Sequence, residues 1–345
     1  MDVSVPYYND MTRISNSNIG WFLNKGPTYL HDMLTGKETG ETGAQLEKGT
    51  MCHSYILRPE DFNSEYLLST ATRPSSSQQT KFCEELVNSV ELEPDKAILK
   101  AYEASYSIVG KTMADRLSKG KEIASTLKDY IQTLRDAKES NRIIISQSDI
   151  NLVTNMMNSI KSHKYAYKLL YPDDPNEKWF HEFQINWEHE TECCILLKGG
   201  YSKDNTIKCK SLLDHISFNE EEHTCTIVDL KTTVHVENFE LSVKQYDYFR
   251  QIEYYREAAE WYIKNILKED INDWYISCYI VAVDSIKGNC CRVFRVELGH
   301  LIPKQKIINI ALNDIRFHQI NNIWDHHRKY YEGDGDEYLD IEYDG

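Results

Sequence analysis

The types and spacing of Asp214, Asp229 and Lys231 suit metal-assisted cleavage of phosphodiesters. The segment from Cys225 to Lys231 is rich in β-branched residues, which favours a strand. Side chains alternate along a strand, so we expect Asp229 and Lys231 on the same face. Carboxylates are ligands that Mg²⁺ and Mn²⁺ prefer, and such a metal would activate water and offset charge on the leaving oxygen.

A hairpin would bring the two aspartates together. Asp214 lies in an apolar run over residues 211–218, and the polar segment 219–223 separates this run from the strand that carries Asp229. Pairing of the two strands then places Asp214 beside Asp229. Lys231 would orient or deprotonate the attacking water, or hold the phosphate.

The alternative is an ordinary surface ion pair, because a D-x-K triplet occurs often by chance. The following residues 246–261 predict a helix, on which Gln251 and Tyr255 are four apart and share a face. These two residues could equally belong to an aromatic core stripe, since Tyr248 and other aromatic residues recur through the same helix. On the triplet alone the surface pair is favoured, and the additional motifs favour a site.

Taken in order, the motifs resemble those of the PD-(D/E)XK nuclease superfamily, and within it the RecB-like branch that includes the RecE-type exonucleases (exonuclease VIII) of phages and prophages. Asp214 matches the first aspartate, residues 229–231 match D-x-K, and residues 251–255 match Q-x-x-x-Y. Upstream, Gly49 to His53 is similar to the G-x-x-x-H helix of this branch. The resemblance covers about residue 14 to about residue 325. Leu213 replaces the proline that gives the superfamily its name, at a position that is degenerate.

The resemblance implies a catalytic set and a metal site. The catalytic residues would be Asp214, Asp229, Lys231, Gln251 and Tyr255, and the metal ligands His53, Glu182, Asp214, Asp229 and the backbone carbonyl of Leu230. The implied cofactor is Mg²⁺ or Mn²⁺. His53 could instead be a hydrogen-bonded residue at a helix boundary, and Glu182 a carboxylate at a strand edge.

The predicted fold is α/β, with a mixed, mostly antiparallel central sheet flanked by helices, as in restriction-endonuclease-like cores. Strands are expected near 179–187, 192–199, 208–218, 224–231, 274–283 and 292–297, and helices near 45–57, 246–267 and 304–331. The predicted parts are an N-terminal helical region (1–70) that contributes His53, a helical insertion (71–140), the nuclease core (141–331) and an acidic tail (332–345) expected to be disordered.

The net charge of −15 is the main argument against a nucleic-acid enzyme, because phosphate binding recruits Lys and Arg. Seven of the negative charges lie in residues 332–345, which contain no Lys or Arg, so the rest of the chain carries −8. A local cluster of basic residues precedes Asp214. It consists of Lys198, Lys203, Lys208 and Lys210, and reads either as a DNA-contact loop or as a solvated hairpin.

The sequence thus predicts a metal-dependent deoxyribonuclease, and the resemblance implies a 5′-to-3′ exonuclease that processes linear double-stranded DNA ends for recombination. The implied partners are DNA ends, a single-strand-annealing protein and further copies of the chain in a ring. The alternatives are an endonuclease or repair nuclease with the same core, and a non-catalytic acidic binding protein. Nine cysteines without a C-x-x-C pair, no signal peptide and no membrane-spanning run favour a cytoplasmic location.

Overall fold

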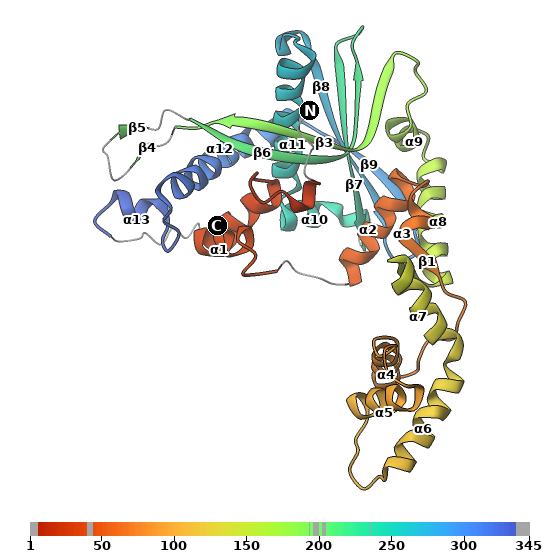
Figure 1. Ribbon diagram of the computed structural model, residues 1–345. Helices are drawn as coiled ribbons and strands as arrows, with labels where there is room; N and C mark the ends of the chain where they lie inside the picture. The colour runs from red at the N-terminus through yellow and green to blue at the C-terminus, as the bar shows by residue number, and fades with distance from the viewer. Residues whose placement is uncertain are drawn as a thin grey trace. The chain divides into compact units, whose positions relative to one another are not determined.

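The structure is a computed structural model of the 345-residue chain, and it divides into two compact units. It describes residues 6–39, 44–192, 194–195, 200–201, 205–234 and 236–335. Residues 1–53 and 156–345 form the first unit, which we call the sheet unit, and residues 54–155 form the helical unit (Figure 1). The unit boundaries fall inside helices α2 (Ala44–Leu57) and α8 (Gln147–Ser162), whereas the sequence placed the insertion at 71–140. Most of the predicted tail, residues 336–345, lies outside the described residues.

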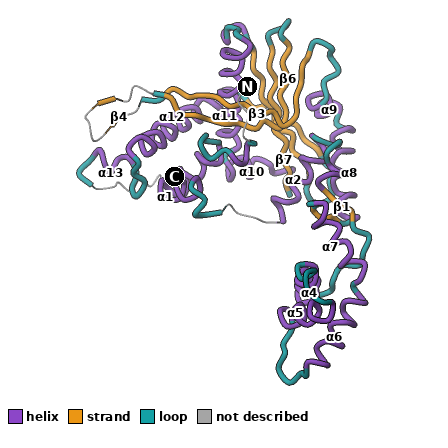
Figure 2. The backbone as a smooth tube through the Cα atoms, viewed as in Figure 1, coloured by secondary structure: helices purple, strands orange, loops and turns teal. Residues whose placement is uncertain are grey.

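A five-stranded sheet in the order β3-β6-β7-β8-β9 is the centre of the sheet unit, and Figure 2 shows these strands in orange among the helices. The strands are β3 (Glu177–Glu190), β6 (Thr206–Asn219), β7 (Thr224–Thr233), β8 (Tyr275–Asp284) and β9 (Cys291–Val296). Only β7 and β8 pair in parallel, and the other three pairs are antiparallel. This confirms the predicted fold class, an α/β protein with a mixed, mostly antiparallel sheet flanked by helices.

The parallel pair requires a crossover, and helices α10 (Phe239–Tyr246) and α11 (Tyr248–Tyr262) supply it, followed by one π-helical turn over Ile263–Leu267. Helix α11 packs across β3, β6, β7 and β8, and α12 (Leu298–Asn321) packs on α11. The opposite face of the sheet contacts α9 (Lys164–Leu170), where the rings of Tyr165 and Tyr279 meet edge to face. The sheet is therefore covered on both faces.

The chain ends of the sheet unit differ in part from the prediction. Helix α1 (Asn16–Leu34) is kinked at Gly26, which precedes Pro27 and whose φ of 86° lies in the left-handed region. The predicted helix over 304–331 is wrong in its extent. Helix α12 begins earlier and ends at Asn321, because Asn322 adopts a left-handed conformation, and a separate short helix α13 covers Arg328–Glu332.

The predicted strand at 192–199 falls largely outside the described residues. Two two-residue strands, β4 (Cys194–Ile195) and β5 (Gly200–Tyr201), pair in this region. The basic residues Lys198 and Lys203 also lie outside the described residues.

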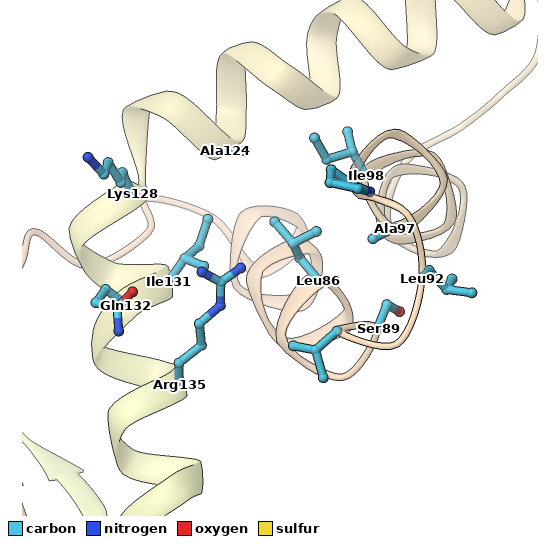
Figure 3. Close-up of a pocket in the computed structure, with 12 residues that line it drawn as sticks. Leu86, Ser89, Leu92, Ala97, Ile98, Ala124, Lys128, Ile131, Gln132 and Arg135 are labelled. Atoms are coloured by element: carbon cyan, nitrogen blue, oxygen red, sulfur yellow. The ribbon is translucent and has the colours of Figure 1, made fainter.

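The helical unit contains helices α4 to α7 and a small parallel pair of strands. The elements are α3 (Phe62–Glu65), β1 (Tyr66–Leu68), α4 (Ser77–Val87), α5 (Pro94–Ser105), α6 (Met113–Thr126), α7 (Lys128–Ser140) and β2 (Ile143–Ile145). Phe82 and Tyr102 are buried between its helices. A pocket of about 350 Å³ opens beside Leu86, Ile98 and Ile131, with Arg135 at its edge (Figure 3). None of the predicted site residues lines this pocket.

A helix that spans a membrane must be long and apolar. Among the described residues, no helix combines enough length with enough apolar character to cross a membrane.

We predict that the sheet core tolerates truncation poorly. Ile280 in β8 is 1% exposed, so Ile280→Ala should lower the free energy of unfolding by about 2–5 kcal/mol through lost burial and a residual cavity. Ile302 on α12 is 65% exposed, and the same substitution there should cost less than about 0.5 kcal/mol. Urea denaturation of both variants measures the difference. Equal losses at the two positions would contradict the packing described for the sheet unit.

Candidate functional site

Asp229 and Lys231 lie on the face of β7 that meets α11. The residues that precede them on this face, Cys225 and Ile227, are fully buried in the core under α11. Asp229 is 1% exposed, and the Lys231 Nζ donates a hydrogen bond of 2.9 Å to its Oδ1. The predicted strand and the shared face of these two residues are confirmed.

The hairpin between β6 and β7 is also as predicted, but it stops short of the two aspartates. Its backbone pairing extends from Asn219 opposite Thr224 to His215 opposite Val228. The next position in the same register would pair Asp214 with Asp229. Instead the backbone N–H of Leu230 donates a hydrogen bond of 2.8 Å to the carboxylate Oδ2 of Asp214. The strands part here, and a side chain replaces the backbone as acceptor.

An irregularity in β3 and β6 lies at the same level. Leu213 and Ile216 both enter the core under α11, so the alternation of β6 slips by one residue between them. The two strands pair on either side of Glu182 and Asp214 but not at these residues. Glu182 has a φ of 46°, a left-handed conformation that costs energy for a residue with a side chain. The site therefore lies at a break in regular strand geometry, and Glu182 occupies the register position opposite Asp214.

His53 reaches this break from helix α2. Its Nε2 lies 2.8 Å from the carbonyl oxygen of Leu230, and since a carbonyl only accepts, Nε2 carries the proton. Its Nδ1 lies 3.4 Å from Oδ1 of Asp214. The G-x-x-x-H pattern places Gly49 on the same helical face, where a β-carbon would lie 3.5 Å from the Thr232 hydroxyl. His53 thus joins the aspartate of β6 to the backbone of β7.

The four ionisable groups of the site shift one another's pKa values. They are His53, Asp214, Asp229 and Lys231. Burial alone would favour neutral forms, but Asp214 raises the pKa of His53, and Asp229 with Asp214 raises the pKa of Lys231. Burial would also raise the pKa of Asp214, yet His53, Lys231 and the N–H of Leu230 lower it. For Asp229, burial outweighs the attraction of Lys231 and raises the pKa to about 6. Lys231 is a cation here, and the two carboxylates differ in how readily they bind a proton.

Helix α11 borders the site from the other side. Gln251 donates a hydrogen bond of 2.8 Å from Nε2 to the hydroxyl of Tyr255, which confirms that the two residues share a face. Burial first, and then the charges of Asp229 and Asp214, raise the pKa of Tyr255 well above its usual value. The phenol of Tyr255 is therefore neutral and lies within electrostatic reach of both carboxylates.

Tyr248 lies beside the site, and it is not among the site residues predicted from the sequence. The sequence names Tyr248 only in support of the aromatic-stripe alternative for Gln251 and Tyr255, whereas its ring centre lies 5.0 Å from the Nζ of Lys231, which is a cation–π contact. Its position three residues before Gln251 on a helix was the available signal.

Lys210 does not belong to a DNA-contact loop. It is 5% exposed, and its Nζ donates hydrogen bonds to the carbonyls of Tyr7 (2.6 Å) and Asp10 (2.5 Å), so it fixes the N-terminal segment. Lys208 of the same predicted cluster is exposed on β6.

The donor atoms are of the types that hard divalent cations prefer. The Oδ2 of Asp229 is buried and lies 2.8 Å from the Lys231 Nζ, and the structure gives it no other partner among the described residues. Asp214, His53 and the carbonyl of Leu230 add oxygen and nitrogen donors nearby. Across the described ranges, no three His, Cys, Asp or Glu side chains already form a metal-binding cluster. His53 and Leu230 bond to each other, and metal binding by both would break that hydrogen bond.

The chain was compared with protein families, curated proteins and solved structures. No family model and no curated protein matches it. Among solved structures, the crystal structure of a "putative exonuclease" from Eubacterium rectale aligns over 93% of this chain and 87% of that chain. The two share 13% sequence identity, with a TM-score of 0.47. A similarity of this size supports no inference about activity, so the functional argument rests on the site's own geometry.

We predict that Mn²⁺ stabilises the protein through Asp229. A ligand that binds only the folded state at about 100 times its Kd adds about 2.7 kcal/mol of stability. The wild type should therefore melt at a higher temperature in Mn²⁺, and Asp229→Asn should lose most of this gain because a carboxylate ligand is removed. The control is Asp314→Asn, which changes a half-buried aspartate on α12 that pairs with Arg328. The assignment fails if Asp229→Asn keeps the full Mn²⁺ shift.

Proposed function

We propose that this protein is a metal-dependent deoxyribonuclease. The observation that carries the proposal is the buried Asp229, whose two carboxylate oxygens both lie within 2.9 Å of the Lys231 Nζ, beside a second carboxylate, Asp214. Burial of two carboxylates so close together is costly unless a cation offsets their charge. Lys231 and His53 supply part of that charge, and a divalent metal would supply more.

Each residue has a role that follows from its position. Asp214 and Asp229 would hold the metal, with His53, the carbonyl of Leu230 and Glu182 as the further proposed ligands. When bound, Mg²⁺ or Mn²⁺ would supply Lewis acidity toward the phosphate and the attacking water. Glu182 supports this role by its register position opposite Asp214.

Lys231 would act as a fixed positive charge. Both aspartates raise its pKa, so it is poorly suited to take a proton and well suited to orient water and offset charge on the phosphate in the transition state. Tyr248 limits where the ammonium can move. Gln251 would hydrogen-bond near the scissile phosphate, while Tyr255 fixes the amide of Gln251 and supports α11 against the sheet.

The more specific proposal is a 5′-to-3′ exonuclease of RecE type that resects linear double-stranded DNA ends for recombination. Its support is the order of the four motifs along the chain, G-x-x-x-H, aspartate, D-x-K and Q-x-x-x-Y, together with their convergence around β7. Action with a single-strand-annealing protein, and assembly of several copies around DNA, belong to the same proposal.

We predict that Lys231→Ala lowers the rate of DNA hydrolysis by at least about 100-fold, since a charge aimed at the transition state is lost. The assay uses linear double-stranded DNA labelled at the 5′ or the 3′ end, with Mg²⁺, Mn²⁺ or EDTA. Lys178→Ala is the control, because Lys178 forms an exposed pair with Glu220 at the far end of the hairpin and should leave the rate unchanged.

Metal-dependent early release of the 5′ label supports the specific proposal, whereas early release of the 3′ label reverses the polarity. Cleavage of covalently closed circles at the same rate favours an endonuclease. If no DNA is cut with any metal, the nuclease proposal is wrong, and the alternative hypothesis of a non-catalytic acidic binding protein is favoured. That alternative predicts that binding survives Lys231→Ala and is lost when the acidic tail, residues 332–345, is deleted.

A further inference from the structure

Arg250, in the first turn of α11, is a buried cation that the proposed chemistry does not use. The residue is 6% exposed. Its Nε donates a hydrogen bond of 3.1 Å to Oδ1 of Asn16, the first residue of α1, and this bond fixes the plane of the guanidinium. The end of the side chain is thus held between α11 and the start of α1.

Within the described part of the chain, the guanidinium of Arg250 has one ion pair, and it is a long one. The nearest acid is Asp247, whose Oδ2 lies 4.0 Å from Nε, and the other carboxylate oxygen of Asp247 pairs with Lys304 at 2.7 Å. Among the described residues, neither Nη1 nor Nη2 of Arg250 donates a hydrogen bond. Both Nη atoms keep some contact with solvent, since neither is among the fully buried atoms without a partner.

Arg256, two turns later on the same helix, shows the usual arrangement. It donates hydrogen bonds to Glu253 and Glu260, so its charge is matched by two carboxylates. Helix α11 therefore pairs the half-buried Arg256 with two carboxylates and leaves both Nη atoms of the buried Arg250 without a hydrogen bond among the described residues.

Asp247 offsets part of the charge of Arg250, while the start of helix α1 adds positive potential. Helix α1 begins at Asn16, and the N-terminus of a helix carries a partial positive charge of about half a unit. One turn further, Gly20 faces the guanidinium, and a β-carbon there would lie 3.0 Å from Nη2. Burial lowers the pKa of Arg250 without neutralising it. A partly desolvated cation beside a helix N-terminus is unfavourable unless an anion binds there.

We propose that Arg250 and the first turn of α1 form a phosphate subsite for the DNA substrate. The inference rests on the proposed nuclease function and adds a second phosphate contact to it. Residues 248 and 250 point about 200° apart around an α-helix, and Tyr248 faces Lys231. Arg250 therefore holds a different phosphate from the one beside Lys231. The five donors of a guanidinium match the oxygens of a phosphodiester, and Arg250 offers its Nη pair for this contact.

The first experiment is independent of catalysis and uses inorganic phosphate. Phosphate also stabilises folded proteins non-specifically, so melting temperatures are compared between variants at equal ionic strength in phosphate and in chloride. The control is Arg295→Gln, which changes an exposed arginine of β9. The melting temperatures of the wild type and of this control should rise more in phosphate, relative to chloride, than the melting temperature of Arg250→Gln does. An equal gain in Arg250→Gln and wild type would overturn the subsite.

The second experiment measures steady-state hydrolysis of DNA against salt. Arg250→Gln should raise KM about tenfold or more with kcat nearly unchanged, and should reduce the slope of log KM against log salt by about one contact. A lower kcat with unchanged KM and slope would contradict a phosphate contact. Ends with a 5′-phosphate and ends with a 5′-hydroxyl distinguish a terminal from an internal phosphate, and a raised KM on either supports the subsite.

A second variant, Gly20→Ala, tests the subsite in case Arg250→Gln does not fold. Gly20→Ala keeps the arginine but crowds Nη2, while alanine favours the helix by up to about 1 kcal/mol relative to glycine. It should raise KM while the melting temperature stays equal or rises. If the wild type cuts no DNA, the nuclease proposal falls, and the phosphate-dependent melting temperature still decides the subsite.

Discussion

The burial of Asp229 is the constraint from which the rest of the site follows. A carboxylate that is 1% exposed must be matched by charge or remain protonated, and here both effects are visible. Lys231 approaches both of its oxygens, and the residual cost raises the pKa of the acid. Asp214 adds a second negative charge that His53 offsets from a helix distant in the sequence. The four groups compensate one another only as a set.

The break in β6 is what allows this set to form. If the β6–β7 ladder continued in register, the backbone N–H of Leu230 would be committed to the sheet, and Asp214 would only face Asp229 across it. Because the strands part, Asp214 accepts that N–H and turns its other oxygen to His53. The left-handed Glu182 on β3 marks the same level, so the irregularity involves both neighbouring strands. The energetic cost of this conformation lies beside Asp214 and His53, and strained backbone is common at functional sites.

The sequence predicts those parts of the site that lie on regular elements. Alternation along β7 correctly places Asp229 and Lys231 together, and helical spacing correctly pairs Gln251 with Tyr255. It does not predict the slip between Leu213 and Ile216, because the slip depends on the pairing of β6 with β3, and strand periodicity describes one strand at a time. The roles of Lys210 and Arg250 are invisible for a related reason. The sequence does not show whether a basic residue pairs with a backbone carbonyl, with a carboxylate or with an anion that the protein binds.

Local charge can reconcile a net charge of −15 with a nucleic-acid substrate. Negative charge over most of a surface weakens non-specific attraction to DNA, so a small number of strong contacts must hold the substrate. Lys231 and the proposed subsite at Arg250 would supply such contacts, because partial burial strengthens each interaction relative to the same charge in water. A divalent metal would add two further positive charges at the same point. Under this proposal the protein would bind DNA tightly only where phosphates reach these groups together, and selectivity for a site such as a duplex end would then come from geometry rather than from overall charge.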